Sequence, residues 1–573
     1  MKTRTWLVSG LLIGAMNLSA AVIPVMSVAD NGPGSMRAAL ATASNGDTID
    51  ASGVSGTILL TSGELLVSNS VTILGPGPAN LAVDGNFASR VFHIAQSNVV
   101  AIANLNITDG DVASYGGGIG ADYAVVLAVS NCWVLGSTAY SGGGIFFGGT
   151  MLILVDTIVF GNSANNGGGL VVNQGTLAIT DCTIKFNSCV GTYYDGGGGI
   201  ENAQGKVMMI NSTVSSNGAT AGAGGGINNF GGTVTILNST INDNGAYFDG
   251  SAIANDSADG ISAVLVVSNS TLSANGSTYG GVIGNEPFGG TAKVGVVNCT
   301  ISDSGGIYNF GILEIGNTIL KPAGLANSGT VTSLGYNLSS DAAGGDGSTG
   351  PGGLLNATGD IRNTDPMLGP LQNNGGPTLT HALLPGSPAI DAGDPNFVPP
   401  PSYDQRGPGF PRVLANWSGS PRIDIGAYEA IPTFTVSDGV PDSWRAHFFA
   451  NQPPGNSNGT ATNGQSCAAC DADGTGQNNL FKYVAGLDPT NPASVFVLQI
   501  QDVNGQPFQK NLIYNPIADG RTYTPQFTTD LVSDAWTTLS NFNGPITNIT
   551  QASVTDLAST NQTKFYRIDI SLP

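Results

Sequence analysis

The sequence predicts an all-β protein in which short parallel strands wind into a solenoid and a small β-sandwich follows. Three observations predict this fold. A phrase of small residues, mostly glycine, followed by Ile or Leu recurs at regular spacing. A second phrase, such as NSTVSSN from Asn211, keeps step with the first over seven units, which indicates an internal repeat. The segments between the phrases are rich in Val, Ile, Thr and Leu and lack helical periodicity. The aliphatic residues of the first phrase are Ile119, Ile145, Leu170, Ile200, Ile227, Ile253, Ile283 and Ile307.

The chain is acidic and contains few charged residues. Its 573 residues include 18 Lys and Arg against 39 Asp and Glu, which gives a formal net charge of −21, and charged residues make up only 10% of the chain. Such a surface repels phosphate backbones and anionic lipids. We therefore expect no nucleic-acid partner and no membrane binding through basic patches.

Residues 1–21 have the features of a secretory signal peptide. Lys2 and Arg4 precede an apolar run over residues 6–16, and the small residues at 19–21 offer a cleavage site. The run is shorter than the roughly 20 apolar residues that a membrane anchor needs. We expect a mature chain that is secreted or exposed at the cell surface and has no integral membrane segment.

Residues 22–333 are expected to form an N-terminal cap and the coils of the solenoid. A solenoid exposes unpaired strand edges at its ends, and these edges need a cover. Ser35 is placed to cap a short amphipathic helix from Met36 to about Ala43. The stretch SVADNGPGSMRAALATASNGDTID resembles the N-terminal cap of exported bacterial β-helix proteins.

A repeat of about 25 residues is long enough for one coil of three short strands, stacked on the next coil at about 4.8 Å in parallel pairing. This arrangement resembles the right-handed parallel β-helix. The glycines then lie at a corner where neighbouring coils bring backbone against backbone and φ is positive. A phosphate-binding role would require a helix after the glycines, and none is expected there.

Two sets of asparagines recur at fixed places in the coils. Stacked amides hydrogen-bond along the axis and satisfy buried turn groups, so we expect each set to form a ladder. The sets are Asn202, Asn229, Asn255, Asn285 and Asn309, and Asn162, Asn187, Asn217, Asn244 and Asn275.

Three cysteines share one repeat position. Cys132, Cys182 and Cys299 take the place that Thr157 holds in another coil, so we expect one inward-facing stack of small residues. Cys132 and Cys182 are two coils apart, about 9.6 Å, which is too far for a disulfide. They are predicted to be buried free thiols, and no partner is assigned to Cys189 in its turn.

Residues 334–430 are expected to form an end segment that caps the solenoid. The phrases DPMLGPLQNNGGPTLTHALLPGSPAIDAGD and RIDIGAYE closely resemble the end segment of proteins with a choice-of-anchor Q domain. The coils also resemble the repeats of chlamydial polymorphic outer-membrane proteins. We expect His381, Asp391, Asp404 and Arg406 to satisfy buried turns in this segment rather than to act in catalysis.

Residues 431–494 form an acidic linker that resembles the calcium-type segment of exported proteins of Verrucomicrobia. Asp471 and Asp473 hold positions 1 and 3 of an EF-hand-like loop, with Gly476 at position 6. Lys482 stands where a bidentate Glu is needed, and its ammonium opposes a cation. Asp471 and Asp473 are therefore the metal candidates, with a relic turn favoured over a weak Ca²⁺ site and no other cofactor expected. Further ligands would have to come from Asp438, Asp442 and Asp488.

Cys467 and Cys470 form a single CxxC pair in this linker. A local disulfide is the favoured interpretation and free thiols are the alternative, because a zinc site needs a second such pair. Residues 495–573 contain alternating segments such as RTYTPQFTT and KFYRIDIS, which predict a small β-sandwich. It resembles the terminal domain that follows calcium-type segments, and display, sorting and carbohydrate contact remain open as its roles.

Polysaccharide chemistry needs particular residues on the outer face of the coils. A lyase needs an Arg or Lys base and clustered Asp, yet no Arg occurs between Arg90 and Arg362 and no His between His93 and His381. A hydrolase needs two or three carboxylates within about 5 to 10 Å. The scattered coil lysines are Lys185, Lys206, Lys293 and Lys321. The carboxylates that could line one outer face, interpreted as solvated turn residues, are Asp195, Glu201, Asp249, Asp256, Asp259 and Glu286.

The sequence therefore favours a non-catalytic β-helix protein with an adhesive or glycan-binding role. Its expected partner is a polysaccharide or a cell-surface glycan, and no catalytic residue is assigned. A polysaccharide-active enzyme, pectate-lyase-like or polygalacturonase-like, is the alternative. A purely structural surface protein is the second alternative.

Overall fold

The computed structural model describes two compact units of the chain, which are treated separately below. Unit 1 comprises Met1–Thr364, Leu371–His381 and Gln405–Gly407, and unit 2 comprises Asp365–Pro370, Ala382–Asp404 and Pro408–Pro573. Residues 20–572 are described except 192–195, 259, 323, 416–420, 431–438, 450–464, 519–520, 532–534, 540–550 and 558–562. Most of the signal-peptide prediction, residues 1–19, lies outside the described residues.

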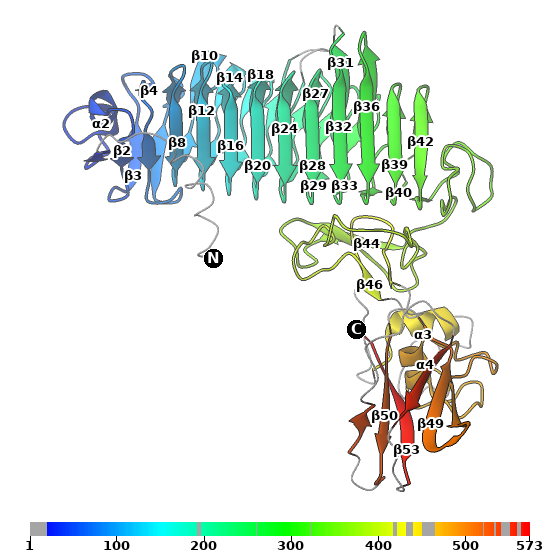
Figure 1. Cartoon of the computed structure of the whole chain (residues 1–573). Helices are drawn as coiled ribbons and strands as arrows, with labels where there is room; N and C mark the ends of the chain where they lie inside the picture. The colour runs from blue at the N-terminus through cyan, green and yellow to red at the C-terminus, as the bar shows by residue number, and fades with distance from the viewer. Residues whose placement is uncertain are drawn as a thin grey trace. The chain divides into compact units, whose positions relative to one another are not determined.

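Unit 1 is a parallel β-helix, as the repeat predicted (Figure 1). Sheet A has 13 strands, from β1 (Val22–Pro24) to β42 (Thr330–Gly335). Sheet B has 12 strands, from β3 (Gly56–Leu59) to β43 (Leu338–Ser339). Sheet C has 11 strands, from β4 (Leu65–Val67) to β41 (Leu325–Asn327). Each coil contributes one strand to each of these sheets.

A fourth sheet corrects the expectation of three strands per coil. Sheet D pairs seven short strands, from β10 (Asp111–Tyr115) to β34 (Gly276–Ser277), so the middle coils carry four strands. These strands follow the second repeat phrase and pair over only a few residues, for example Ser163 with Ser188 and Ala164 with Cys189. Such short pairs of small residues are difficult to distinguish from turns by pattern alone.

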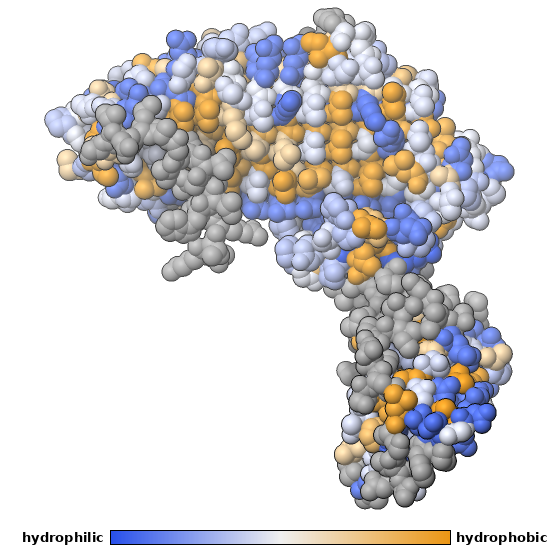
Figure 2. Space-filling view, viewed as in Figure 1, coloured by the Kyte–Doolittle hydropathy of each residue, from blue (hydrophilic) through white to orange (hydrophobic). Residues whose placement is uncertain are grey.

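The interior of the coils is one continuous apolar cluster. The inward residues of sheets A, B and C, such as Leu152, Val159 and Ile145, are fully buried and belong to it. Outward residues of sheet A are apolar as well: Val99, Met208 and Val266 are all exposed. Figure 2 shows the resulting apolar band on the face formed by the labelled strands of sheet A.

Both asparagine ladders are confirmed. In one ladder Asn162 Nδ2 donates to Asn187 Oδ1 at 2.9 Å, and Asn187 Nδ2 donates to Asn217 Oδ1 at 2.9 Å. In the other, Asn202 Nδ2 donates to Asn229 Oδ1 at 2.7 Å. The same amides also bond backbone groups that face the interior, as Asn217 Nδ2 does with the Ile184 carbonyl at 3.0 Å.

The predicted stack of small residues is also confirmed. The backbone N–H of Cys132 donates to Thr157 Oγ1, and the Thr157 N–H donates to Cys182 Sγ, both at 3.4 Å. Cys132, Cys182, Cys189 and Cys299 are buried thiols outside any disulfide. Cys189 lies in β22 (Ser188–Cys189) rather than in a turn. Burial raises the pKa of Cys132 and of Cys182 to about 12.

The glycine corner has the predicted geometry. Gly142 has φ of 65°, and a Cβ on Gly143 would lie 2.5 Å from the carbonyl oxygens of Gly168 and Ser163 in the next coil. Only glycine allows the coils to approach this closely. The N-terminal cap also forms: α2 (Met36–Thr42) begins after Ser35, whose side chain accepts a hydrogen bond from the Ala38 N–H.

Part of the end segment belongs to unit 1 and lies against sheet B. Gln405 accepts a hydrogen bond from Thr271 Oγ1 at 2.6 Å, and its amide donates to Thr240 Oγ1 at 2.9 Å. The imidazole of His381 lies 2.9 Å from Ser273 Oγ. These residues hold the segment to β29 (Thr240–Asn242) and β33 (Thr271–Ser273).

The described part of unit 2 contains two helices, the antiparallel pair β46 (Leu414–Ala415) and β47 (Pro421–Arg422), and two three-stranded antiparallel sheets. The helices α3 (Asp442–Phe449) and α4 (Asn479–Ala485) contribute Trp444 and Tyr483 to one apolar cluster. One sheet is β48 (Val497–Val503), β49 (Gln506–Asn515) and β52 (Ala552–Asp556). The other is β51 (Thr537–Thr538), β50 (Thr522–Thr528) and β53 (Phe565–Ser571). Both sheets bury residues in a second cluster, so the small antiparallel domain is confirmed.

The single CxxC pair is a disulfide, Cys467–Cys470, as favoured from the sequence. Among the described residues, no helix has both the length and the apolar character needed to cross a bilayer.

Candidate functional site

The outer face of sheet C carries a groove of about 750 Å³. The strands that position it are β7 (Phe92–Ile94), β11 (Ile119–Ala121), β15 (Ile145–Phe147), β19 (Leu170–Asn173) and β23 (Ile200–Ala203), which are consecutive in the sheet. Because side chains alternate along a strand, burial of the Ile or Leu points the next residue outward. This register sets His93, Gly120 and Phe146 side by side on the outside.

Glycines open the floor of the groove. Gly120, Gly148, Gly149, Gly175 and Gly205 all line it. The ring of Tyr115 stacks on that of Phe146, with centroids 4.7 Å apart, and Tyr123 is 78% exposed nearby. A ligand can therefore approach the backbone closely while an aromatic surface contacts its apolar face.

Amide side chains occupy the next coils of the groove. Gln174 Nε2 donates to Gln204 Oε1 at 3.2 Å, so the two exposed amides form a short ladder along the axis. Asn173 is exposed beside them. These groups can donate to and accept from hydroxyls.

A network of charged residues closes the N-terminal end. Arg90 is 9% exposed and pairs with Glu64 at 2.9 Å, while its Nη2 donates to the Tyr115 carbonyl at 2.7 Å. The ring nitrogens of His93 contact Glu64 Oε1 at 2.9 Å and Asp122 Oδ2 at 3.1 Å. Arg90 therefore hydrogen-bonds the backbone of Tyr115, whose ring stacks on Phe146. The carboxylate of Glu64 offsets the positive charge of Arg90, so the network is not strongly cationic.

Lys206, the first residue of β24 (Lys206–Ile210) where the chain passes from sheet C to sheet A, lies at the opposite end of the groove. Its side chain is exposed and makes no ion pair among the described residues. The other coil lysines lie elsewhere: Lys185 lies over Phe160, and Lys293 pairs with Glu314 at 2.8 Å. Lys206 is thus the one of the four that the fold places in the groove.

Sequence reasoning missed Arg90 and His93 as site residues. The long interval without Arg or His argued against a lyase, but Arg90 and His93 mark the start of that interval and lie on the outer face themselves. The available signal was their position: His93 falls one residue after the inward Phe92 of a short strand, which makes it an outward residue.

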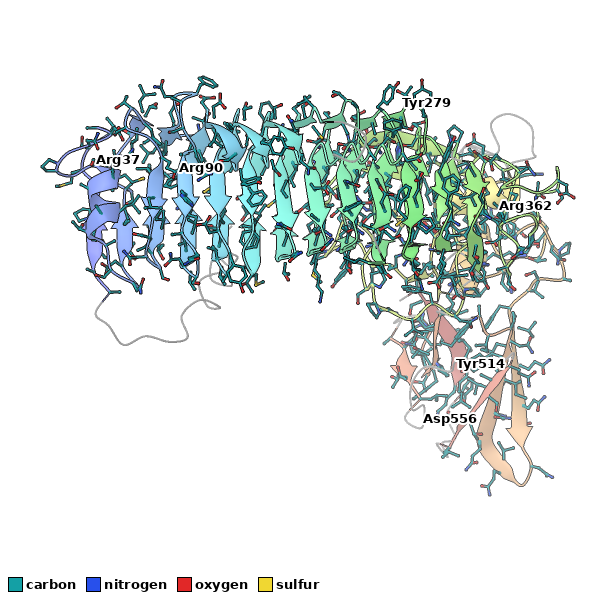
Figure 3. The ribbon with its side chains drawn as sticks, turned by 90° about the horizontal axis from the view of Figure 1, so that it is seen from above. Arg37, Arg90, Tyr279, Arg362, Tyr514 and Asp556 are labelled. Atoms are coloured by element: carbon teal, nitrogen blue, oxygen red, sulfur yellow. A yellow bond between two sulfur atoms is a disulfide. The ribbon has the colours of Figure 1, made fainter. Side chains whose placement is uncertain are left out.

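A second polar cluster lies further along the same face. Asn173, Ala203, Phe230, Asp256 and Glu286 are successive register partners, from β19 through β27 (Ile227–Phe230) and β31 (Ile253–Ala258) to β35 (Ile283–Phe288). Asn173 belongs to the groove, so the groove and the carboxylates share one outward column. Figure 3 labels Arg90 among the N-terminal coils and Tyr279 among the later coils.

Asp249, Asp256 and Glu286 form this cluster. Burial, followed by the charge of Asp249, raises the pKa of Asp256 to about 7. Burial, a hydrogen bond with Asp249 and the two neighbouring charges raise the pKa of Glu286 to about 8. Asp249 Oδ1 is buried without a hydrogen-bond partner. The interpretation of these three as separate solvated turn residues was therefore wrong, because the stacking of coils brings them together.

The structure does not place the other carboxylates proposed from the sequence beside Asp256 in one outward column among the residues it describes. Glu201 is 4% exposed and lies two strands before Asp256 in sheet C, while Asp195 and Asp259 lie outside the described residues. Tyr247, two residues before Asp249 in the chain, makes an edge contact with Tyr279 with centroids 5.1 Å apart, and Tyr279 is 66% exposed. The cluster is thus a partly buried group of three carboxyls.

The calcium-type loop in unit 2 is closed by a lysine. Lys482 pairs with Asp473, and both side chains are 1% exposed. Burial alone would raise the pKa of Asp473, but the hydrogen bonds from Lys482 and Thr475 and the charge of Lys482 together lower it. Asp471 accepts a hydrogen bond from the Thr475 N–H at 3.1 Å.

The loop therefore does not fit a divalent cation, because the Lys482 ammonium already pairs with Asp473 and supplies the positive charge that a metal ion would bring. No group of three or more His, Cys, Asp or Glu among the described residues is arranged to hold a metal ion. Asp438, offered as a further ligand, lies outside the described residues.

Of the predicted turn residues of the end segment, His381 and Arg406 are buried in unit 1, while Asp404 is buried and Asp391 partly buried in unit 2. Asp404 accepts a hydrogen bond from the Glu429 N–H at 2.8 Å, and Asp424 Oδ1 accepts one from the Asp391 N–H at 2.7 Å. Burial, with the charge of Asp424, raises the pKa of Asp391 to about 7. These carboxylates bond the turns of the segment, as expected.

Comparison with known proteins adds a likeness of fold. No protein-family model and no curated protein matches the chain. A solved structure, "Crystal structure of pectate lyase Pel9A", is 17% identical, covers 72% of this chain and 98% of that chain, and has a TM-score of 0.36. At this TM-score the likeness carries no conclusion about the activity or ligand of this chain.

Proposed function

We propose that this is a secreted or surface-exposed β-helix protein that binds an extended glycan along the outer face of sheet C. The observation that carries the proposal is the groove, where a stacked aromatic pair, an amide ladder and a glycine floor meet. Aromatic faces contact the C–H groups of sugar rings and amides bond their hydroxyls, which is the mixture that polar ligands of this kind require.

The proposal includes the way the protein reaches its ligand. Residues 1–21 have the features of an export signal, and the segment 334–430 resembles a choice-of-anchor Q end segment. An exported chain meets extracellular polysaccharides. The net charge of −21 supports partners other than nucleic acid.

A glycan panel tests the proposal. We expect the purified chain to bind at least one linear polysaccharide, and Tyr115→Ala to weaken that binding about tenfold, the effect of losing about 1.4 kcal/mol. Tyr140→Ala is the matched control, because Tyr140 is an exposed coil tyrosine outside the groove. Equal loss in both variants, or no binding on a broad panel, would favour a purely structural protein.

The second candidate function is hydrolysis of the bound glycan. The specific observation is the cluster of Asp249, Asp256 and Glu286, in which carboxyl groups with raised pKa neighbour a third carboxylate. Such an arrangement can supply a general acid and a general base. A chain that continued along the axis beyond the groove would pass these groups.

Release of reducing ends separates this function from binding alone. Hydrolysis predicts release by the native chain, a decrease of at least 100-fold in Glu286→Gln, and unchanged release in the control Glu314→Gln, on sheet A. Binding without any release of reducing ends would leave the non-catalytic function in place and exclude the hydrolase. Eliminative products are not expected from either function.

A further inference from the structure

We propose that the groove holds a neutral, linear glycan lengthwise, parallel to the axis of the β-helix, with about one sugar for each coil between Arg90 and Lys206. The inference rests on the proposed function and adds to it the direction, the number of subsites and the charge class of the ligand. It follows from the spacing and the order of the groove residues.

The spacing comes from the sheet. Arg90 precedes β7 and Lys206 follows β23, so four coil steps separate them in sheet C. At about 4.8 Å for each step, the groove runs for about 19 Å. A sugar ring in an extended chain advances by nearly the same length as one coil step. Similar groups on successive coils can therefore contact successive sugars.

The order of the side chains gives each part of the groove its own chemistry. Tyr115 and Phe146 supply the aromatic wall in the coils nearest Arg90. Gln174 and Gln204 supply the amide ladder in the next two coils, and Lys206 ends the groove with a donor. A ligand lying across the groove would contact only one of these groups. A ligand lying lengthwise contacts all of them.

The charges favour a neutral ligand. The guanidinium of Arg90 is paired with Glu64, and the ring nitrogens of His93 contact Glu64 and Asp122, so two carboxylates lie close to the one guanidinium at that end. At the other end Lys206 makes no ion pair with the residues that the structure describes, and the net charge of the whole chain is −21. A polyanion would be repelled at long range by this net charge.

The test is calorimetry with cello-, manno- and xylo-oligosaccharides of two to six units, and with tetragalacturonate. We expect affinity for one neutral series to rise at least tenfold from the disaccharide to the tetrasaccharide and then to level off. Lys206→Ala should lower the affinity for the tetrasaccharide and leave that for the disaccharide nearly unchanged. Lys185→Ala is the matched control, because that coil lysine lies outside the groove.

Each of the other possible results of this calorimetry would overturn a different part of the proposal. Equal affinity for di- and hexasaccharides would overturn the lengthwise arrangement while leaving glycan binding intact. Binding of tetragalacturonate in preference to every neutral series would overturn the charge class. If none of these probes bound although the polysaccharide panel gave a Tyr115-dependent signal, the arrangement of subsites would be wrong. Failure on the panel as well would overturn the proposed function itself.

Discussion

Single carboxyl groups make the stability of this protein depend on pH. Asp256, Glu286 and Asp391 have pKa values raised to about 7, 8 and 7 by burial and neighbouring charge. An unfolded chain ionises such groups near pH 4. The folded state thus binds more protons, so their contribution to stability is full below about pH 4 and is lost as the pH rises through 7 to 8.

Thermal unfolding should therefore occur at lower temperature at pH 8.5 than at pH 5.5. Asp256→Asn removes one of these groups, and we expect its effect on stability to be more favourable at pH 8.5 than at pH 5.5 by about 2 kcal/mol, because the carboxyl costs about 1.4 kcal/mol for each pH unit between pH 5.5 and its folded pKa. The exposed Asp243→Asn is the control. A melting temperature that increases with pH in this range would contradict the assignment.

Lys482 is expected to prevent the loop that contains Asp471 and Asp473 from binding Ca²⁺. In the native chain, titration with Ca²⁺ should show weak binding or none, because the ammonium is already paired with Asp473. Lys482→Glu places an acidic ligand at that position, so it should unfold more easily without Ca²⁺ and be stabilised when Ca²⁺ is added.

The control for this change is Lys510→Glu, which alters a more exposed lysine of β49 that pairs with Asp502. It should show no response to Ca²⁺. Calorimetric binding of Ca²⁺ in the micromolar range by the unmodified chain would show that Lys482 does not exclude the cation.

At the scale of elements, the ladders tie each coil to the next. Asn217 Oδ1 accepts from the Asn187 N–H at 3.0 Å, and its Nδ2 donates to the Ile184 carbonyl at 3.0 Å. Both backbone groups are buried beside the core. A buried polar group that loses its partner costs about 1 to 3 kcal/mol.

Asn217→Ala should therefore lower the free energy of unfolding by about 3 kcal/mol, because it leaves more than one buried group unpaired. Urea denaturation measures the change. Asn165→Ala, which alters an exposed asparagine of a neighbouring coil, should change stability by less than about 0.5 kcal/mol. Equal effects of the two substitutions would show that the ladder contributes no more than a surface amide.

The repeat pattern predicted most of the coil interior. The positions of Ile145 and Leu170, of the Asn187 ladder and of the Cys182 stack follow from the recurrence of residue types at one spacing. Sheet D was not predicted, because its strands are two to five residues long and rich in small residues. These pairs depend on the exact stacking of turns rather than on a pattern of apolar residues.

The site was less predictable because it lies across coils. Asp249 and Glu286 are far apart in the sequence, and their contact depends on the lengths of the intervening turns. Arg90 and His93 belong to coils without the full glycine phrase, so the repeat did not align them with the groove. Only the register of sheet C places Asn173 and Asp256 in one column.

For the molecule as a whole, the proposed function places an extended glycan along the outer face of sheet C. Sheet A offers a broad apolar face and unit 2 a separate small domain, so the location of binding is the decisive fact. The proposal predicts which segments a bound glycan would cover. These segments line the groove and comprise residues 120–124, 146–150, 173–176 and 204–206.

Hydrogen–deuterium exchange with and without the glycan selected on the panel tests this claim most directly. Glycan bound in the groove should slow exchange in the segments that line it. Tyr115→Ala should remove this protection. Slower exchange confined to sheet A, or to residues 497–572 of unit 2, would contradict the proposal, because the glycan would then bind elsewhere.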